Sequence, residues 1–201
     1  IGPDGERVLW VKDTPDPDAD KSQSDVYLTY RDAPHGGDAT ATIRLTRTGN
    51  NGTPRWSPDG HHIAFLSSRE TDDEHSGTQL WRLDPRGGAP EALTSVEHGV
   101  QNARWLDKER LLFTTRETST RYEEHLEATE DDARVVEDTT LFRPVRLFVV
   151  DVSTGKVTRV TENENQITEF APSPDGRYVV YSLDDSPIDA DARNQPHQFL
   201  L

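Results

Sequence analysis

The side chains that could do chemistry are mostly carboxylates. Asp16, Asp18 and Asp20 alternate as the first ligands of a calcium loop do. However, Lys21 stands where such a loop needs glycine, and Tyr27 stands where it needs a bidentate glutamate. The chain contains no cysteine, so thiolate metal sites and cysteine nucleophiles are excluded. We therefore expect a solvated linker at these aspartates and no metal-binding residue.

Neither the histidines nor the serines form a pattern that predicts catalysis. His61 and His62 directly follow a Pro-Asp-Gly turn, which places them at a hairpin tip, and His125 lies beside Glu123 and Glu124 in an acidic stretch. No G-x-S-x-G sequence occurs, and no serine is expected on a strand-to-helix turn that would expose a nucleophile. The sequence thus predicts no catalytic residue and no cofactor within this chain.

Charge excludes further classes of function. The chain has 22 Lys and Arg residues against 37 Asp and Glu residues, a net charge of −15, so it lacks the basic footprint of a nucleic-acid-binding protein. Binding to an anionic membrane surface is disfavoured for the same reason, and no apolar run is long enough to span a bilayer. The cations are 18 Arg and 4 Lys, and the acids are spread along the whole chain. This pattern favours a cytoplasmic protein of a salt-adapted prokaryote over a binding face for cationic ligands.

A repeated turn must position these residues. Pro-Asp-Gly occurs at 3–5, 58–60 and 174–176, with a degenerate copy at 106–109, and a β-rich run follows each turn. Proline presets φ at the second turn position, aspartate suits the third, and glycine closes the turn, so each copy predicts a hairpin. The aspartates of the four turns follow one another at intervals of 55, 48 and 68 residues.

A second hairpin follows each first one. The spacing from Asp84 to Thr94 equals that from Asp151 to Thr161, at ten residues in both cases. Residues 26–30 and 45–46 give the first unit the same hairpin with a longer turn, which contains Gly36 and Gly37. Each unit is therefore expected to hold four short antiparallel strands, and sheets that recur in this way are typical of β-propeller blades.

The predicted fold is all-β, an incomplete β-propeller over residues 1–201 with three repeat periods and part of a fourth blade. The chain begins in the first hairpin of one blade and stops after the first hairpin of another, whereas closed propellers need at least four blades. We expect Trp56, Trp81 and Trp105 between blades rather than stacked on a ligand. The extra length of the longest period, 116–138, is polar and acidic, and predicts a loop insertion with room for a helical turn at 122–128.

The repeat resembles that of TolB-like propellers and of the N-terminal propellers of the prolyl oligopeptidase family of serine peptidases. The resemblance rests on Trp56-Ser57-Pro58-Asp59-Gly60 and the following apolar run. Segments 11–27 and 134–152 are similar to the acylaminoacyl-peptidase branch. The resemblance implies a C-terminal α/β-hydrolase domain of the same protein, outside this chain, that carries a Ser-Asp-His triad. It also implies a propeller that admits short peptide substrates, and it leaves homo-oligomer formation open.

Tyr122-Glu123-Glu124 is similar to the paired-glutamate motif with which dipeptidyl peptidases of this family hold the free α-ammonium group of a substrate. Adjacent carboxylates suit that task because charge-assisted hydrogen bonds to an ammonium group are strong. The surrounding residues depart from the motif, and a solvated acidic loop is the alternative. Glu123 and Glu124 are the candidate substrate-binding residues. The alternative function is a non-catalytic, TolB-like propeller for protein–protein interaction.

Overall fold

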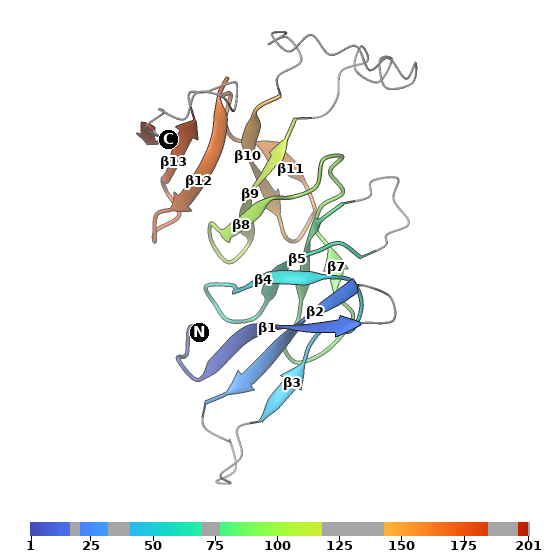
Figure 1. The fold of residues 1–201 in the computed structure, drawn as a ribbon. Helices are drawn as coiled ribbons and strands as arrows, with labels where there is room; N and C mark the ends of the chain where they lie inside the picture. Colours follow the sequence, from blue (N-terminus) through green and yellow to red (C-terminus); the bar gives the residue numbers. More distant parts are fainter. Residues whose placement is uncertain (17–20, 32–40, 70–76, 118–142, 185–196, 201) are drawn as a thin grey trace.

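The structure is a computed structural model, and it describes residues 1–16, 21–31, 41–69, 77–117, 143–184 and 197–200 (Figure 1). Within these ranges the chain forms β-strands and no helix. The strands pair into four antiparallel sheets that follow one another along the chain.

The first sheet contains β1 (Arg7–Asp16), β2 (Lys21–Tyr30) and β3 (Thr42–Arg44). The second contains β4 (Asn51–Trp56), β5 (Ile63–Ser67), β6 (Gln79–Leu83) and β7 (Glu91–Ala92). The third contains β8 (Asn102–Trp105), β9 (Arg110–Arg116), β10 (Val145–Asp151) and β11 (Val157–Arg159). The fourth contains β12 (Gln166–Pro172), β13 (Val179–Asp184) and β14 (His197–Leu200).

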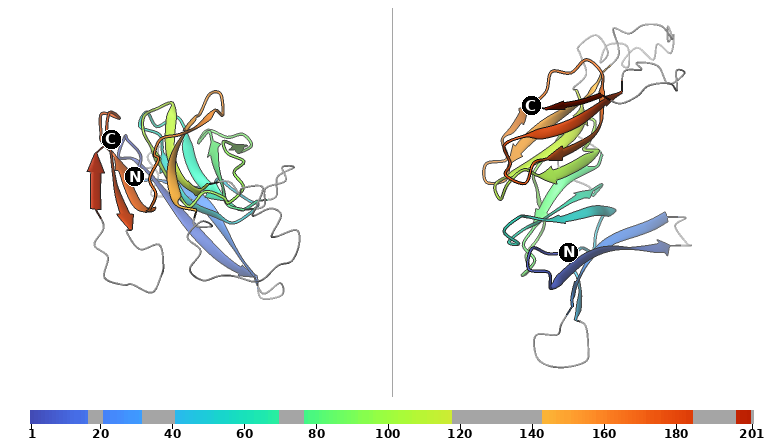
Figure 2. Two further views of the ribbon diagram at one scale, coloured as in Figure 1. Left: turned by 90° about the horizontal axis from the view of Figure 1, so that it is seen from above. Right: turned by 90° about the vertical axis from the view of Figure 1, so that its left-hand side faces the viewer.

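The sheets stack face to face in sequence order, and an apolar core fills each of the three interfaces (Figure 2). Successive residues of a strand point to opposite faces, so the four apolar residues of β5 divide between two cores. Ile63 and Phe65 face the first sheet, whereas Ala64 and Leu66 face the third. Between the first and second sheets lie Val26, Ile63, Phe65, Trp81 and Leu83. Between the second and third lie Ala64, Leu66, Leu80, Leu93, Val100, Ala103, Trp105, Leu111, Phe113, Val150 and Val152. Between the third and fourth lie Leu112, Leu147, Ile167, Phe170 and Val179.

This stacking confirms the all-β propeller fold and the expected place of the tryptophans. Trp81 and Trp105 are each 8% exposed and lie in two different inter-sheet cores. Trp56 is half-buried and packs against the core shared by the first and second sheets. Cations cover two of the rings: the guanidinium carbon of Arg7 lies 4.3 Å from the Trp56 ring centroid, and that of Arg69 lies 4.6 Å from Trp81.

The turn between β4 and β5 shows why the repeat carries Ser-Pro-Asp-Gly. The Gly60 N–H donates to the Ser57 carbonyl at 2.9 Å, and Gly60 has a φ of +71°, a conformation that glycine adopts without strain. The Ser57 hydroxyl donates to the Asp59 carboxylate at 2.6 Å and accepts from the His62 N–H at 2.9 Å. The first of these bonds lowers the pKa of Asp59. The turn between β12 and β13 repeats the arrangement with Ser173, Asp175 and Gly176.

A threonine closes the last strand of three units. In the second sheet the Thr94 hydroxyl accepts from the Leu80 N–H at 2.9 Å and donates to the Gln79 side-chain carbonyl at 2.9 Å. All of these groups are buried, so the bonds satisfy donors and acceptors that water does not reach. The equivalent bonds run from the Val26 N–H to Thr46 at 2.9 Å and from the Leu147 N–H to Thr161 at 3.0 Å.

The strands differ from the prediction in two respects. The final unit does not stop after its first hairpin, because β14 adds a third strand that pairs with β13. No Pro-Asp-Gly or Gly-Gly turn precedes β14, so turn chemistry does not predict this strand. The last strand of three units ends before the threonine that closes the predicted repeat: Thr42–Arg44 before Thr46, Glu91–Ala92 before Thr94 and Val157–Arg159 before Thr161. In the first unit, the Leu45 N–H still donates to the Val26 carbonyl at 2.8 Å beyond the end of β3. At Thr46 the side-chain hydroxyl takes over the pairing, because it accepts from the Val26 N–H.

Candidate functional site

The structure does not place the residues that the sequence singles out for substrate binding. Glu123 and Glu124 lie outside the described residues, as do His125 and the predicted helical turn at 122–128. The predicted insertion 116–138 is described only at its start, where Arg116 is the last residue of β9. The role of the paired glutamates therefore stays a prediction.

The other polar groups considered above lie where surface groups are expected. The ring of His61 is exposed at the hairpin tip, and its Nδ1 lies 3.3 Å from the Asp59 carboxylate. Asp16 is the last residue of β1, and its backbone is in register with that of Lys21 on β2. Residues 17–20 lie outside the described part of the chain. Across the described ranges, no group of three or more His, Asp or Glu side chains is arranged to hold a metal ion. The same ranges contain no helix of the length and apolarity needed to span a membrane.

The first strands of three sheets carry side chains that a ligand could contact. β4, β8 and β12 each form the first edge of their sheet. In a propeller the first strand of each blade lies closest to the central channel, where ligands and partners have access. The side chains of β4 and β8 that do not enter a core are therefore candidates for contact with a ligand.

The backbone of β4 is irregular at this edge. Two residues, Thr53 and Pro54, lie between the pairs that Gly52 and Arg55 form with β5, whereas β5 has one residue in the same interval. This is a β-bulge, a feature that redirects side chains and is frequent beside functional sites. Thr53 has a φ of +46°, and no other non-glycine residue in the described ranges has a positive φ. A β-branched residue adopts this conformation at a cost, so the surrounding structure must hold it in place.

The bulge borders a crevice between the second and third sheets. The gap measures about 180 Å³ with the open solvent beside it included, and it is too narrow to admit a water molecule. Arg55 is the only charged residue that lines it, and the Arg55 carbonyl accepts a hydrogen bond from the Trp105 indole N–H at 3.1 Å. This bond ties β4 to β8 across the sheet interface. The lining residues are Thr53, Arg55, Ala64, Phe65, Leu66, Leu80, Ala103 and Leu111.

A second arginine lies on the neighbouring inner strand. Arg104 on β8 donates from Nη1 to the Asn102 side-chain carbonyl at 3.0 Å and to the Ala103 carbonyl at 3.2 Å. Burial lowers the pKa of Arg104, and the positive charge of Arg55 lowers it further. Among the described residues neither guanidinium forms an ion pair with a carboxylate. The two arginines lie on the first strands of neighbouring sheets.

Sequence reasoning missed this pair, although the sequence contained a sign of it. An Arg-Trp dipeptide stands at the same point of two successive repeats, at 55–56 and 104–105. The predicted core role of the tryptophans concerns only one face of these strands and does not extend to the arginines beside them. Because alternate residues of a strand point to opposite faces, a buried tryptophan at this edge places the preceding arginine on the other face.

Comparisons with known proteins agree with the predicted likeness. The chain is 28% identical over 212 residues to the uncharacterized peptidase YuxL of Bacillus subtilis, a match that covers 99% of this chain and 31% of that protein. An acylaminoacyl peptidase of Pyrococcus horikoshii matches with a TM-score of 0.62 at 16% identity, over 98% of this chain and 29% of that chain. The β-propeller domain of the Trilobed protease from Pyrococcus furiosus matches with a TM-score of 0.56 at 15% identity, over 98% of this chain and 51% of that chain. No family model matches.

These matches confirm the propeller fold and the likeness to the propeller region of a peptidase. The chain spans 31% of the length of the curated relative, so that relative contains much more than the part matched here. The structural matches are below 25% in identity and bear on the fold alone.

Proposed function

We propose that this chain is the propeller region of a longer serine-type peptidase, in which the propeller covers the catalytic domain and restricts entry to short peptides. The observation that carries the proposal is the match of 99% of the chain to 31% of a peptidase. The sequence supports it too, since it contains no G-x-S-x-G nucleophile motif of its own. Catalysis would then lie in a C-terminal α/β-hydrolase domain, and the acylaminoacyl-peptidase branch is the form of the family that the sequence most resembles.

The test uses the full-length protein. We expect a fluorophosphonate probe to label one serine outside residues 1–201, and we expect hydrolysis of blocked peptides to fall steeply as the peptide lengthens. Loss of labelling together with the absence of peptide hydrolysis would favour the alternative, a TolB-like propeller that binds a protein partner. Labelling together with a hydrolysis rate that does not depend on peptide length would support the peptidase activity and contradict the gating role of the propeller.

The paired glutamates refine this proposal. Glu123 and Glu124 would bind the free α-ammonium group of a substrate, and their replacement by glutamine keeps size while removing both charges. We expect the double variant to raise KM for peptides with a free amino terminus and to leave KM for blocked peptides unchanged. An equal effect on both kinds of peptide would reject the role.

The acidic surface is the second refinement. We propose that the net charge of −15 and the scarcity of lysine are adaptations to high salt, because screening removes the self-repulsion of a strongly charged protein. The thermal midpoint of the full-length protein should rise between low and molar salt. A midpoint that is constant or falling over this range would contradict the proposal.

A further inference from the structure

The hairpin of β1 and β2 is longer than its counterparts in the central sheets. β1 and β2 have ten residues each, whereas β5 and β6 have five each and β9 and β10 have seven each. The pairing is regular over the whole length, from Arg7 opposite Tyr30 to Asp16 opposite Lys21. Figure 2 shows the far end of this hairpin projecting beyond the stack of sheets. We call residues 12–16 and 21–25 the arm.

Packing within the propeller does not explain the length of the arm. Val26, in register with Val11, lies in the core between the first and second sheets, and no described residue of the arm belongs to any of the three cores. A two-stranded ribbon without an apolar face is only marginally stable in water, so a second contact is expected to maintain it. The exposed side chains of the arm are those of Lys12, Asp13, Thr14, Pro15 and Ser22.

The base of the arm is fixed to the second sheet. The Ser24 N–H donates to the side-chain carbonyl of Asn50 at 3.3 Å, and the Asn51 amide donates to the Ser24 carbonyl at 2.8 Å. The Gln23 amide donates to the Arg47 carbonyl at 2.8 Å. All three partners lie in the segment that leads into β4. The propeller therefore sets the direction of the arm, as contact with a partner in one orientation requires.

The two ends of the sheets offer different surfaces to a partner. At the end remote from the arm, Asp59, Asp84 and Asp151 each accept hydrogen bonds from their own turn. At the end of the arm β4 begins and β5 ends, because Asn51 is in register with Ser67. The two longest intervals between consecutive strands, from β9 to β10 and from β13 to β14, leave from this end as well. A partner would meet closed turns at one end and the projecting arm at the other.

The chemistry of the arm selects the kind of partner. Pro15 has no N–H and lies on β1, an edge strand, so it opposes pairing with a strand of a second copy. Tight complexes between separate proteins need buried aromatic or apolar anchors, and the exposed residues of the arm supply none. A polar contact is sufficient between domains of one polypeptide, because the tether gives a high effective concentration.

We propose that the arm is a contact surface for the catalytic domain of the same polypeptide. The inference rests on the proposed function, which places that domain outside residues 1–201. The match covers 31% of the curated relative, so most of that relative lies outside the part that this chain resembles. Contact at the arm would orient the propeller over the catalytic domain through polar side chains.

The first experiment measures how fast a maleimide attached to polyethylene glycol modifies single cysteines in the folded full-length protein, relative to the rate in denaturant. Thr14→Cys and Ser22→Cys sample opposite faces of the arm, because Ser22 is in register with Pro15, the neighbour of Thr14. Thr158→Cys is the matched control, an exposed threonine on β11. Residues 1–201 contain no cysteine, and any cysteine elsewhere is measured in the parent. We expect one of the two arm cysteines to react about tenfold more slowly than the control, as for a docked state favoured by about 1.4 kcal/mol.

The second experiment identifies what covers the arm. Thr14→p-benzoylphenylalanine or Ser22→p-benzoylphenylalanine, whichever position is protected, is irradiated in the full-length protein, and mass spectrometry locates the cross-linked peptide. We expect this peptide to lie in the domain whose serine a fluorophosphonate labels. Thermal midpoints equal to that of the parent show that the variants are folded.

Three results would overturn the inference: arm cysteines that both react as fast as Thr158→Cys, a cross-link to a peptide within residues 1–201, or a cross-link to a second copy in a mixture of isotope-labelled and unlabelled protein. Failure of the proposed function is distinct from these. It would appear as a protein that no fluorophosphonate labels and that hydrolyses no peptide, and protection of the arm in such a protein would assign the contact to a domain that is not catalytic. Rapid modification of the arm in a protein that is labelled would reject the contact and leave the peptidase function intact.

Discussion

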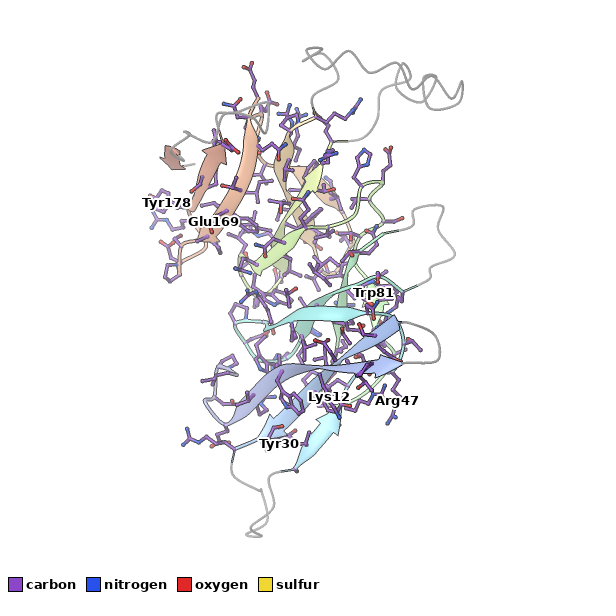
Figure 3. All side chains as sticks on the ribbon, viewed as in Figure 1. Lys12, Tyr30, Arg47, Trp81, Glu169 and Tyr178 are labelled. Atoms are coloured by element: carbon purple, nitrogen blue, oxygen red, sulfur yellow. The ribbon has the colours of Figure 1, made fainter. Side chains whose placement is uncertain are left out.

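The two central sheets and the two end sheets follow one repeat, yet they are buried very differently. All residues of β5 in the second sheet are buried, as are the five middle residues of β9 in the third. In the end sheets apolar side chains reach solvent: Trp10 on β1 is 38% exposed, and Val180 on β13 is 36% exposed. Figure 3 shows Tyr178 at the outer side of the fourth sheet, where it is 46% exposed, and Trp81 between the first and second sheets.

The difference shows that the repeat encodes the turns, whereas the composition of each strand depends on how many sheets cover it. The turn chemistry is the same in central and end sheets, because Ser57 and Ser173 bond their turns in the same way. The strands differ, because a strand covered on both faces must be apolar at every position, whereas a strand covered on one face alternates. The run 63–66 is continuously apolar, while β13 mixes valine with serine and aspartate. Strand composition thus reports whether a sheet has one neighbour or two.

The largest expected effect tests this contrast in burial. Phe113 is fully buried in the core between the second and third sheets. Phe113→Ala should lower the free energy of opening of the third sheet by about 3–5 kcal/mol, through lost apolar contact and the cavity that remains. Tyr178→Ala at the exposed face should cost less than about 1 kcal/mol. Native-state hydrogen exchange on the full-length protein measures both, sheet by sheet.

An equal loss for the two variants would break the comparison. It would mean that another part of the full-length protein covers Tyr178, so that the fourth sheet has two neighbours as the central sheets do. The alternation of β13 would then need a different explanation, such as a polar interface.

A smaller effect should distinguish the two kinds of threonine closure. Thr94→Val leaves the buried Leu80 N–H without its acceptor and removes one of the two donors to the Gln79 side-chain carbonyl, at a cost of about 1–3 kcal/mol. In the first sheet Thr46 donates to the carboxylate of Asp25, which is 2% exposed. Thr46→Val should therefore cost more than Thr94→Val, because a buried charge loses a donor.

Denaturant unfolding of the full-length protein, followed by hydrogen exchange in each sheet, measures these two costs. Serine at either position should restore most of the stability, because it keeps the hydroxyl. Thr158→Val is the control, since Thr158 is exposed on β11 and should change stability by less than about 0.5 kcal/mol. A cost at Thr46 below that at Thr94 would show that the end sheet does not depend on its closure.

Much of the fold follows from the sequence because turn chemistry is local. Pro58-Asp59-Gly60 needs only its own neighbours to form a turn, and the ten-residue spacing from Asp84 to Thr94 fixes the second hairpin. β14 could not be predicted in this way, because no Pro-Asp-Gly or Gly-Gly turn precedes its pairing with β13. The geometry at Arg55 escapes prediction for a similar reason: it depends on the bulge at Thr53 and on the bond from the Trp105 indole of the next sheet, and sequence-local turn chemistry encodes neither.

The smallest expected effect concerns the acid sensitivity of the turns. In the turn between β10 and β11, Asp151 Oδ1 accepts from the Ser153 hydroxyl at 2.6 Å and from the Thr154 N–H at 2.8 Å, and these bonds lower the pKa of Asp151 to about 2. In the end sheet, the bond from the Glu6 N–H, together with Arg7, lowers the pKa of Asp4. A carboxylate with a depressed pKa in the folded state stabilises the protein above its unfolded pKa of 3.8, and this contribution disappears as the pH falls through the folded value.

Asp151→Asn should therefore lower the thermal midpoint Tm at pH 5 by a small amount, and the difference from the parent should close between about pH 4 and pH 2. Because both side chains are exposed, solvent weakens the effect, and we expect a shift of a few degrees at most. Asp4→Asn should show a difference of the same sign, closing as the pH falls below 3.8. Circular dichroism melts of the full-length protein at pH 5, 4, 3 and 2 give the four differences for each variant. A difference for Asp151→Asn that stays constant down to pH 2 would mean that the carboxylate is not held by its turn. Such a result would also distinguish the Asp151 turn from the turns of Ser57 and Ser173, whose hydroxyls bond their turn aspartates in the same way.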